Sequence, residues 1–246
     1  MIENAQLISL SRQIALQRQM DVVANNIANL NTTGFKAEQI LFEEYVMPVA
    51  RDRTFPSLDQ PLSYVQDWAT VHDFAAGAMV QTGNELDVAL SGEGFFAVGT
   101  PAGERWTRAG AFQLDSTGML VDLSGHPVLG EGGPIQFGPE ETGIAIAADG
   151  SVSSSAGAKG RLRIVEFANP QELAREGANL FSGGTPLAAA GTRVMQGFIE
   201  RSNVSGVAEM TEMIRVTRSY ESIANLTQKQ DELRRAAIQR LGDANA

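Results

Sequence analysis

The chain has 246 residues, a formal net charge of −10 at neutral pH and no cysteine. The acidic balance argues against nucleic-acid binding, which needs clustered Lys and Arg, and the lack of cysteine excludes disulfides and thiolate sites. No secretory leader is visible, and no stretch approaches the roughly 18 uncharged apolar residues of a membrane span, so we expect no insertion in a membrane.

Glycine and proline divide the chain into two ends and a middle. Neither residue occurs in the first 30 positions or between Val207 and Leu241, whereas most of the 25 glycines lie between residues 82 and 200. Because both residues interrupt helices, the ends predict long helices. The predicted fold class is α+β, with terminal helices forming a coiled-coil-like domain, a central antiparallel β-rich domain and an extended linker.

The N-terminal segment, residues 1–36, carries apolar residues at helical spacing. The stripe changes phase near Gln17, and its second run is a coiled-coil-like seam. The two runs contain Leu7, Leu10 and Ile14, then Leu16, Met20, Val23, Ile27 and Leu30.

Three asparagines, Asn25, Asn26 and Asn29, lie on this helix with no charged residue between Asp21 and Lys36. At about 100° per residue, Asn25 and Asn29 face away from the apolar stripe and Asn26 lies on a flank. A buried amide without a partner costs roughly 1–3 kcal/mol. We interpret the helix as surrounded by protein on all sides, with amides facing other subunits. The alternative is asparagines that cap local turns or are solvated.

The helix is expected to end in the turn that contains Thr32, Gly34 and Phe35. Gly34 can adopt the left-handed conformation that follows a helix, and Phe35 can pack back on the last turn.

The middle of the chain predicts β structure after a linker. Residues 37–81 contain three prolines among scattered aromatic residues, which predicts an extended linker packed against another part of the molecule. Between residues 82 and 196, short apolar alternations are separated by turns such as 115–118 and 149–150, which predicts an antiparallel β domain. A strand is expected over 161–167, and Asn169–Pro170 is expected to begin a short helix.

The C-terminal segment, residues 197–246, predicts a second axial helix that pairs with the first. Asn203 to Gly206 supplies start chemistry, and Glu209 falls in the first turn, where negative charge is favourable. One side carries a stripe that Gln230 interrupts. The stripe contains Met213, Val216, Tyr220, Ile223, Leu226, Leu233, Ala237 and Leu241.

Two terminal motifs carry a family resemblance. "ANNIANLNTTGFK" (24–36) and "GFIERSNVSGVAEMTEMIRVTRSYE" (197–221) resemble the paired signatures of bacterial flagellar axial proteins, which include rod and hook subunits. Between them, "LDVALSGEGFFAV" and "HPVLGEGGPI" resemble the middle domain of proximal-rod members more than that of distal-rod members. The resemblance covers essentially the whole chain.

The resemblance implies a structural subunit of the basal-body rod, located where the rod crosses the periplasm. Such a subunit polymerises helically through its terminal helices into a torque-transmitting drive shaft with a central export channel. The implied partners are other rod subunits and further copies of the chain, the flagellar type III export apparatus and the bushing rings, with no cofactor. The implied assembly residues are Asn25, Asn26, Asn29, Thr32, Gly34, Phe35, Ser202, Asn203, Val204, Glu209, Met210, Met213, Ile214 and Tyr220.

Two alternatives remain open at this level: a distal-rod or hook-type subunit, and a peptidoglycan-modifying enzyme. For the enzyme, the sequence offers little chemistry. Its two histidines, His72 and His126, lack metal-ligand spacing, and Ser91 lacks the glycine that a nucleophile elbow needs. We therefore expect no catalytic, cofactor or metal site.

Overall fold

The computed structural model describes residues 2–46, 63–177 and 179–243. The chain divides into two compact units. The first comprises Met1–Ile27, Glu38–Val71 and Gly206–Ala246, and the second comprises Ala28–Ala37 and His72–Ser205. Both units are therefore discontinuous in sequence, and residues 28–37 and 197–205, which lie within the two predicted terminal segments, belong to the second unit.

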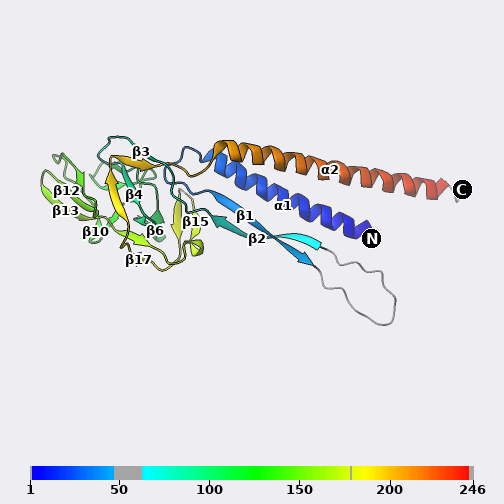
Figure 1. The fold of residues 1–246 in the computed structure, drawn as a ribbon, viewed down its shortest axis with the longest axis horizontal. Coiled ribbons are helices and arrows are strands. Elements are labelled where there is room, and N and C mark those ends of the chain that lie inside the picture. The colour runs from blue at the N-terminus through cyan, green and yellow to red at the C-terminus, as the bar shows by residue number, and fades with distance from the viewer. Residues whose placement is uncertain (1, 47–62, 178, 244–246) are drawn as a thin grey trace, which may run out of the picture. The chain divides into compact units, whose positions relative to one another are not determined.

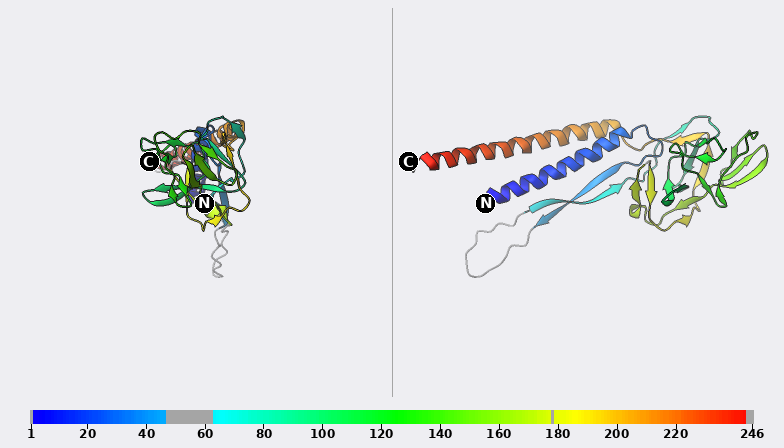
Figure 2. Two further views of the ribbon diagram at one scale, coloured as in Figure 1. Left: turned by 90° about the vertical axis from the view of Figure 1, so that its left-hand side faces the viewer. Right: turned by 180° about the vertical axis from the view of Figure 1, so that it is seen from behind.

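Two long helices dominate the first unit. Helix α1 (Ile2–Ala28) and helix α2 (Gly206–Asp243) lie side by side and run in opposite directions, so that α1 ends where α2 begins (Figures 1 and 2). Ala15, Val23 and Val216 are buried, which shows that part of each apolar stripe is covered within the unit. No helix in the described residues is long and apolar enough to cross a membrane.

Helix α1 ends earlier than the sequence predicted. It stops at Ala28, and residues 29–34 form turns in which the Thr32 N–H donates to the Asn29 carbonyl at 3.1 Å. Gly34 adopts the predicted left-handed conformation, with φ of 66°, although six residues beyond the helix. Helix α2 starts at Gly206 with Glu209 in its first turn, as predicted.

The predicted extended linker is a paired β structure where it is described. Strands β1 (Glu38–Val46) and β2 (Ser63–His72) form a two-stranded sheet in the first unit. Residues 47–62, the middle of the predicted linker, lie outside the described residues. The prediction missed this pairing because strand pairing depends on residues far apart in sequence, and local composition shows only that the chain is extended.

The second unit is an assembly of small antiparallel sheets. Its largest sheet has six strands in the order β15-β16-β6-β5-β14-β17, and its next largest is β11-β12-β13. Two-stranded sheets pair β18 with β4, β19 with β3, β7 with β8 and β9 with β10. The strands are β3 (Met79–Gln81), β4 (Val88–Ser91), β5 (Phe95–Thr100), β6 (Gly103–Thr107), β7 (Gln113–Leu114), β8 (Leu120–Val121), β9 (Leu129–Gly130), β10 (Gly133–Pro134), β11 (Ala145–Ile146), β12 (Ser151–Ser154), β13 (Gly157–Arg161), β14 (Ile164–Glu166), β15 (Ala174–Glu176), β16 (Leu180–Ser182), β17 (Leu187–Ala188), β18 (Arg193–Gln196) and β19 (Phe198–Glu200).

Strand β5 divides the core of this unit in two. Successive side chains of a strand point to opposite faces. Accordingly Phe96 and Val98 join one buried cluster, while Phe95 and Ala97 join the other. The second cluster is aromatic, and Phe95 meets the ring of Phe181 at a centroid distance of 5.9 Å. A strand with two buried faces reads as a continuous apolar run, so alternation could not reveal it.

The predicted turns are present. The Asp115 carboxylate accepts hydrogen bonds from the Thr117 and Met119 N–H groups at 2.8 and 2.9 Å, and Gly150 closes the second turn by donating to Ala147. The strand predicted over 161–167 is wrong as one element, because β13 ends at Arg161 and β14 begins at Ile164. The expected short helix is a 3₁₀ turn, η1 (Pro170–Glu172).

Candidate assembly interface

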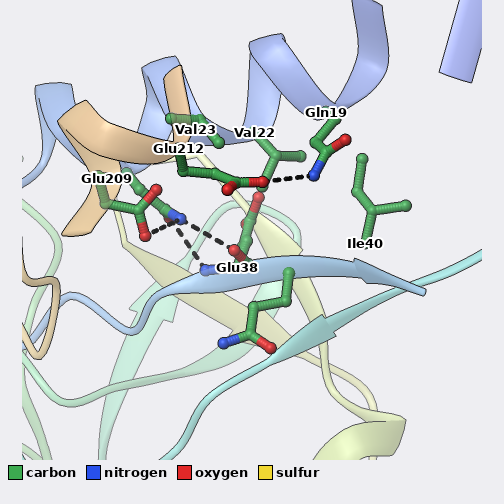
Figure 3. Close-up of a pocket in the computed structure, with 9 residues that line it drawn as sticks. Gln19, Val22, Val23, Glu38, Ile40, Glu209 and Glu212 are labelled. Atoms are coloured by element: carbon green, nitrogen blue, oxygen red, sulfur yellow. Dashed lines mark hydrogen bonds between the residues drawn. The ribbon is translucent and has the colours of Figure 1, made fainter. Parts of the chain in front are cut away.

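Asn26 is the most buried of the three asparagines. Its side chain is only 1% exposed. Its Oδ1 accepts from the Glu38 N–H at 3.0 Å, and its Nδ2 donates to the Glu38 carbonyl at 2.9 Å and to Glu209 Oε1 at 3.2 Å (Figure 3). A primary amide has both a donor and an acceptor. It can therefore pair with the N–H and the carbonyl of one residue, as the backbone of a neighbouring strand does. Asn26 therefore joins α1, β1 and α2 within one chain, and its burial requires no second subunit.

The other two asparagines differ from Asn26. Asn25 has an exposed side chain. Asn29 accepts a hydrogen bond from the Thr32 hydroxyl at 3.0 Å within the turn that follows α1. Within residues 24–36, the Asn26 amide therefore joins three elements, and the Asn29 amide stabilises a local turn.

A polar pocket lies beside Asn26 among α1, β1 and α2 (Figure 3). Its cavity volume is about 280 Å³. Gln19 donates to Glu212 across it at 2.7 Å. The residues that line it are Gln19, Val22, Val23, Asn26, Glu38, Gln39, Ile40, Glu209 and Glu212.

The two α2 carboxylates in this pocket have opposite pKa shifts. Burial raises the pKa of Glu209, against the opposing hydrogen bond from Asn26. The hydrogen bond from Arg215 lowers the pKa of Glu212, with which it forms an ion pair. Glu209 thus accepts a hydrogen bond from the neutral Asn26 amide, whereas Glu212 pairs with the charged Arg215 guanidinium.

In the second unit, a buried charge cluster joins the two signature motifs. Lys36 Nζ donates to Glu200 Oε1 at 2.7 Å and to the Ala75 carbonyl at 2.7 Å, and Arg108 Nε lies 3.5 Å from Glu200 Oε2. The three charged side chains are at most 3% exposed. Burial lowers the pKa of Lys36, and the Glu200 carboxylate opposes that shift. A buried ion is stable only when paired, so these residues must come together for the unit to close.

Gly34 makes this close approach possible. Its N–H donates to the Glu200 carbonyl at 2.7 Å, and a Cβ atom added there would lie 2.4 Å from the backbone nitrogen of Ala109. Phe35, next to it, is fully buried under the Arg175 guanidinium, 4.0 Å from the ring centroid. Phe35 therefore packs under an arginine of the β-rich unit, and its packing on the last helical turn stays a prediction.

Asn203 joins the same segments through its amide. Its Oδ1 accepts from the Ala37 N–H at 2.7 Å, and its Nδ2 donates to the carbonyls of Asp73 and Ala75 at 2.8 and 3.2 Å. Ser202 accepts from the N–H of Val204 at 3.3 Å in the turn before α2. These two residues of the second signature motif therefore make hydrogen bonds within the chain.

The predicted assembly residues fall into three groups by exposure. Met210 and Ile214 are each 55% exposed on α2, and Asn25 is exposed on α1. The half-buried residues are Asn29, Thr32, Ser202, Asn203, Val204, Glu209, Met213 and Tyr220, and the buried ones are Asn26, Gly34 and Phe35.

Sequence reasoning assigned no role to Glu38, Lys36, Arg108 or Glu200. Lys36 closes the first motif and is one of only three lysines in the chain, which is a weak signal. Its carboxylate partner, Glu200, lies 164 residues away, so no local pattern could have paired them. In the described residues, no group of acidic or histidine side chains could hold a metal ion.

A chain with two antiparallel terminal helices that expose apolar side chains is built as a subunit of a larger assembly. Three family models match it: a flagella basal body rod protein model over residues 7–36, the D1 domain of the flagellar hook protein FlgE/F/G over 89–154, and the C-terminal region of flagellar basal body rod FlgEFG proteins over 195–240.

Curated relatives match along nearly the whole chain. The flagellar basal-body rod protein FlgF of Caulobacter vibrioides is 38% identical, covering 99% of this chain and 100% of the relative. FlgF of Mesorhizobium japonicum is 34% identical over 98% and 99%. FlgG of Bacillus subtilis is 35% identical over 88% and 91%. The chain therefore belongs to the flagellar basal-body rod protein family and is FlgF-like within it. It is a structural subunit of the rod, located in the flagellar basal body.

Proposed function

We propose that this rod subunit polymerises helically by burying the exposed apolar faces of α1 and α2 against neighbouring subunits. The supporting observation is the set of large apolar side chains that the described helices expose. On α1 these are Leu10 and Ile14, each 52% exposed, and on α2 they are Val207, Met210, Ile214, Leu226 and Leu233, at 81, 55, 55, 54 and 71%.

The size of this surface favours assembly. Fully burying a Leu, Ile or Met side chain contributes roughly 1.5–3 kcal/mol, so covering several half-exposed ones supplies several kcal/mol per subunit. A lone subunit leaves this surface in water. We infer that the helices gain most of their order when they assemble, which keeps the chain suitable for the flagellar type III export apparatus.

The paired helices α1 and α2 also account for the seam, the channel and the open form of the assembly. The covered parts of the stripes, around Val23 and Val216, form a coiled-coil-like seam between α1 and α2. Aligned helices of successive subunits line a central export channel and resist torsion, so the assembly acts as a drive shaft. Head-to-tail contacts that do not close produce an open filament of this kind. The FlgF resemblance supports a place in the proximal rod, with the β-rich unit available to the bushing rings.

The test replaces two exposed side chains that the monomer does not need. Met210→Ser with Ile214→Ser should leave the fold intact, because both side chains are more than half exposed. The variant is expected to be produced normally, to be absent from isolated basal bodies and to abolish swimming in a strain that lacks the native copy. The control is Leu123→Ser, which changes a 70% exposed leucine of the β-rich unit. Normal incorporation of the double variant would contradict the proposal.

Two alternatives remain testable. A distal-rod role, which the FlgG relatives keep open, predicts that the chain occupies the distal part of purified rods in immunolabelling. A peptidoglycan-modifying activity predicts clearing of cell-wall material by the purified chain in a zymogram. Neither outcome is expected here, because FlgF relatives match the chain at full length and no sequence motif supplies a catalytic pair.

A further inference from the structure

Residues 33–37 pack against the β-rich unit, although the chain on both sides of this region belongs to the other unit. Residues up to Ile27 and from Glu38 to Val71 lie in the first unit, whereas residues 28–37 are part of the second. No described strand of the second unit's sheets comes from this segment. We call residues 33–37 the docking segment and His72–Ser205 the β-rich body. The docking segment therefore meets the body as a short insertion from outside its sheets.

The docking segment adds nothing to the apolar core of the body. Phe35 is fully buried, yet neither of the two buried apolar clusters contains it. Both clusters are formed by described residues between Phe74 and Val194. Because apolar burial is the main source of stability, the body can keep its core when the docking segment is withdrawn.

The backbone of the docking segment is bound in the way that an extended peptide ligand is bound. The Gly34 N–H donates to the Glu200 carbonyl at 2.7 Å. The Phe35 carbonyl accepts from the Asn203 N–H at 3.3 Å, and the Ala37 N–H donates to Asn203 Oδ1 at 2.7 Å. In peptide recognition such main-chain bonds supply affinity, and side-chain pockets supply specificity.

Three successive side-chain positions supply the specificity here. Gly34 has a φ of 66°, and a Cβ atom added there would lie 2.4 Å from the backbone of the body. The Phe35 ring is buried under the Arg175 guanidinium, and Lys36 Nζ donates to Glu200 Oε1 at 2.7 Å. The body thus selects glycine, then an aromatic ring, then a cation.

The groups that bind Lys36 are held in place by the body itself. Glu200 Oε1 also accepts from the Gly77 N–H at 2.8 Å, and Glu200 Oε2 lies 3.5 Å from Arg108 Nε. Arg108 in turn donates to backbone carbonyls within residues 92–94. The Glu200 carboxylate therefore keeps a cation and an N–H donor when Lys36 is withdrawn, so no unpaired buried charge opposes the opening.

The order of the chain separates the docking segment from its binding groups. Asn203 follows Ala37 by 166 positions, and Glu200 follows Lys36 by 164. A chain made from its N-terminus therefore carries the docking segment for most of its length before the site that binds it is complete.

We propose that the β-rich body is a peptide-recognition site for a Gly-Phe-Lys segment, which the chain fills with its own residues 33–37 and can empty without unfolding the body. The ligand class is an extended peptide in which glycine, an aromatic residue and a cation follow one another. Every residue of the site lies in the second unit, so the proposal does not depend on how subunits polymerise. A tethered segment has an effective concentration of about a millimolar, so a free peptide binds well only when the chain's own segment is disabled.

A full-length chain with a disabled docking segment tests the proposal. Gly34→Val adds a branched side chain where a Cβ atom has no room. It is made in a Trp68→Phe background, so that fluorescence reports Trp106 in the body. The urea transition of Trp106 should remain cooperative, which shows a folded body. Lys36, which is fully buried in the parent chain, should become acetylated as fast as the exposed Lys229.

Peptide binding to the same chain is measured by fluorescence anisotropy. A fluorescein-labelled peptide with the sequence of residues 30–40 should bind the Gly34→Val chain at least about 50-fold more tightly than it binds the parent chain. The matched control chain carries Gly83→Val, because Gly83 has a φ of 76° with open space around its Cβ position. It should keep its own segment bound and bind the peptide no better than the parent does.

Peptide variants test the three selective positions. Gly34→Ala, Phe35→Ala and Lys36→Gln in the peptide should each weaken binding about tenfold or more. Glu38→Gln, which lies outside the docking segment, should change binding by less than about twofold. Glu200→Gln in the Gly34→Val chain should weaken binding of the native peptide but not weaken binding of the Lys36→Gln peptide further, because the two groups act as a pair.

Each contrary outcome overturns the inference. An unfolded body in the Gly34→Val chain would mean that the docking segment is part of the core fold. Continued protection of Lys36 in that chain would mean that the site does not select glycine, and a folded, opened chain that binds no peptide would mean that the site does not exist. Additive effects of Lys36→Gln and Glu200→Gln would contradict the assigned pairing. None of these results bears on the Met210 and Ile214 serine variant, which tests the proposed function separately.

Discussion

At the scale of single residues, two asparagine amides perform the same task in different units. Asn26 binds both backbone groups of Glu38, and Asn203 binds the backbone of Ala37, Asp73 and Ala75. Each amide satisfies donors and acceptors of segments that are distant in sequence. A carboxylate could only accept hydrogen bonds, and an apolar residue of similar size could make none of them.

Asn26→Asp tests the role of the amide. The substitution removes the donor to the Glu38 carbonyl and places a carboxylate next to Glu209, so we expect a loss of about 3 kcal/mol in unfolding free energy at neutral pH. Thermal unfolding followed by far-ultraviolet circular dichroism measures it. Asn225→Asp, at an exposed position of α2, should change stability by less than about 0.5 kcal/mol. Equal effects of the two variants would contradict the assigned role of Asn26.

Glu209 should give the first unit a specific pH dependence. Burial raises the pKa of Glu209 above its ordinary value, so its contribution to stability is fully present below the unfolded pKa and is lost as pH rises through the folded pKa. The wild type should therefore gain stability relative to Glu209→Gln as pH falls through that window. Denaturant titrations of both chains at several pH values measure the difference, and a pH-independent difference would be inconsistent with the raised pKa.

Gly34→Ala tests the close approach at the charge cluster. The new Cβ would meet the backbone of Arg108 and Ala109 in a residue whose φ is 66°. We expect a loss of more than about 3 kcal/mol, measured by urea unfolding. Gly83→Ala is the control, because Gly83 has a φ of 76° with open space around its Cβ position, and should cost only about 1 kcal/mol of backbone strain. A similar cost for both variants would mean that the steric contact at Gly34 is unimportant.

At the scale of elements, the unequal lengths of α1 and α2 determine which parts of α2 are covered. Val216 is fully buried, whereas Leu233, which lies beyond the end of α1, is 71% exposed. The apolar stripe continues along the whole of α2. The difference in exposure between its first and second halves therefore reflects what packs against each half.

Hydrogen exchange should reveal this division along α2. In the purified monomer, amides of residues 229–243 are expected to exchange faster than those of residues 210–220, because local opening is easier where fewer apolar contacts hold a helix. In isolated basal bodies both segments should be protected. Uniform protection of α2 in the monomer would show that the helix is stable without a partner along its second half.

At the scale of the whole molecule, each unit is built from segments far apart in the chain. The second unit contains the buried clusters around Phe96 and Phe95, whereas the first unit has few buried apolar side chains among its described residues. Apolar burial is the main source of stability, so the two units should differ in stability.

Phe96→Ala should separate the two units in an unfolding experiment. Phe96 is fully buried in the second unit, and its truncation should cost about 3–5 kcal/mol there. The fluorescence transition of Trp106, which lies in the second unit, should move to lower urea concentration when it is followed in a Trp68→Phe background. The far-ultraviolet helical signal of the first unit should not move with it. A single shared shift of both signals would mean that the units unfold cooperatively.

Much of the architecture is readable from local pattern. The ranges without glycine or proline correspond to α1 and α2, and the Asp-containing turns at 115–118 and 149–150 are present. The end of α1 was predicted too late, since the turn over residues 29–34 satisfies its own polar groups. The strand pairing of β1 with β2 and the central position of β5 were missed, because a pairing partner leaves no mark in the neighbouring sequence.

What the sequence by itself determined is the set of helices, turns and signature motifs, because periodicity, helix breakers and turn residues act over a few positions. Only the tertiary structure decided the roles of individual motif residues. Asn26 and Asn203 hold the chain to itself, Lys36 pairs with Glu200, and Met210 and Ile214 remain exposed. The physical reason is that burial and ion pairing depend on residues that the fold brings together from more than 100 positions away.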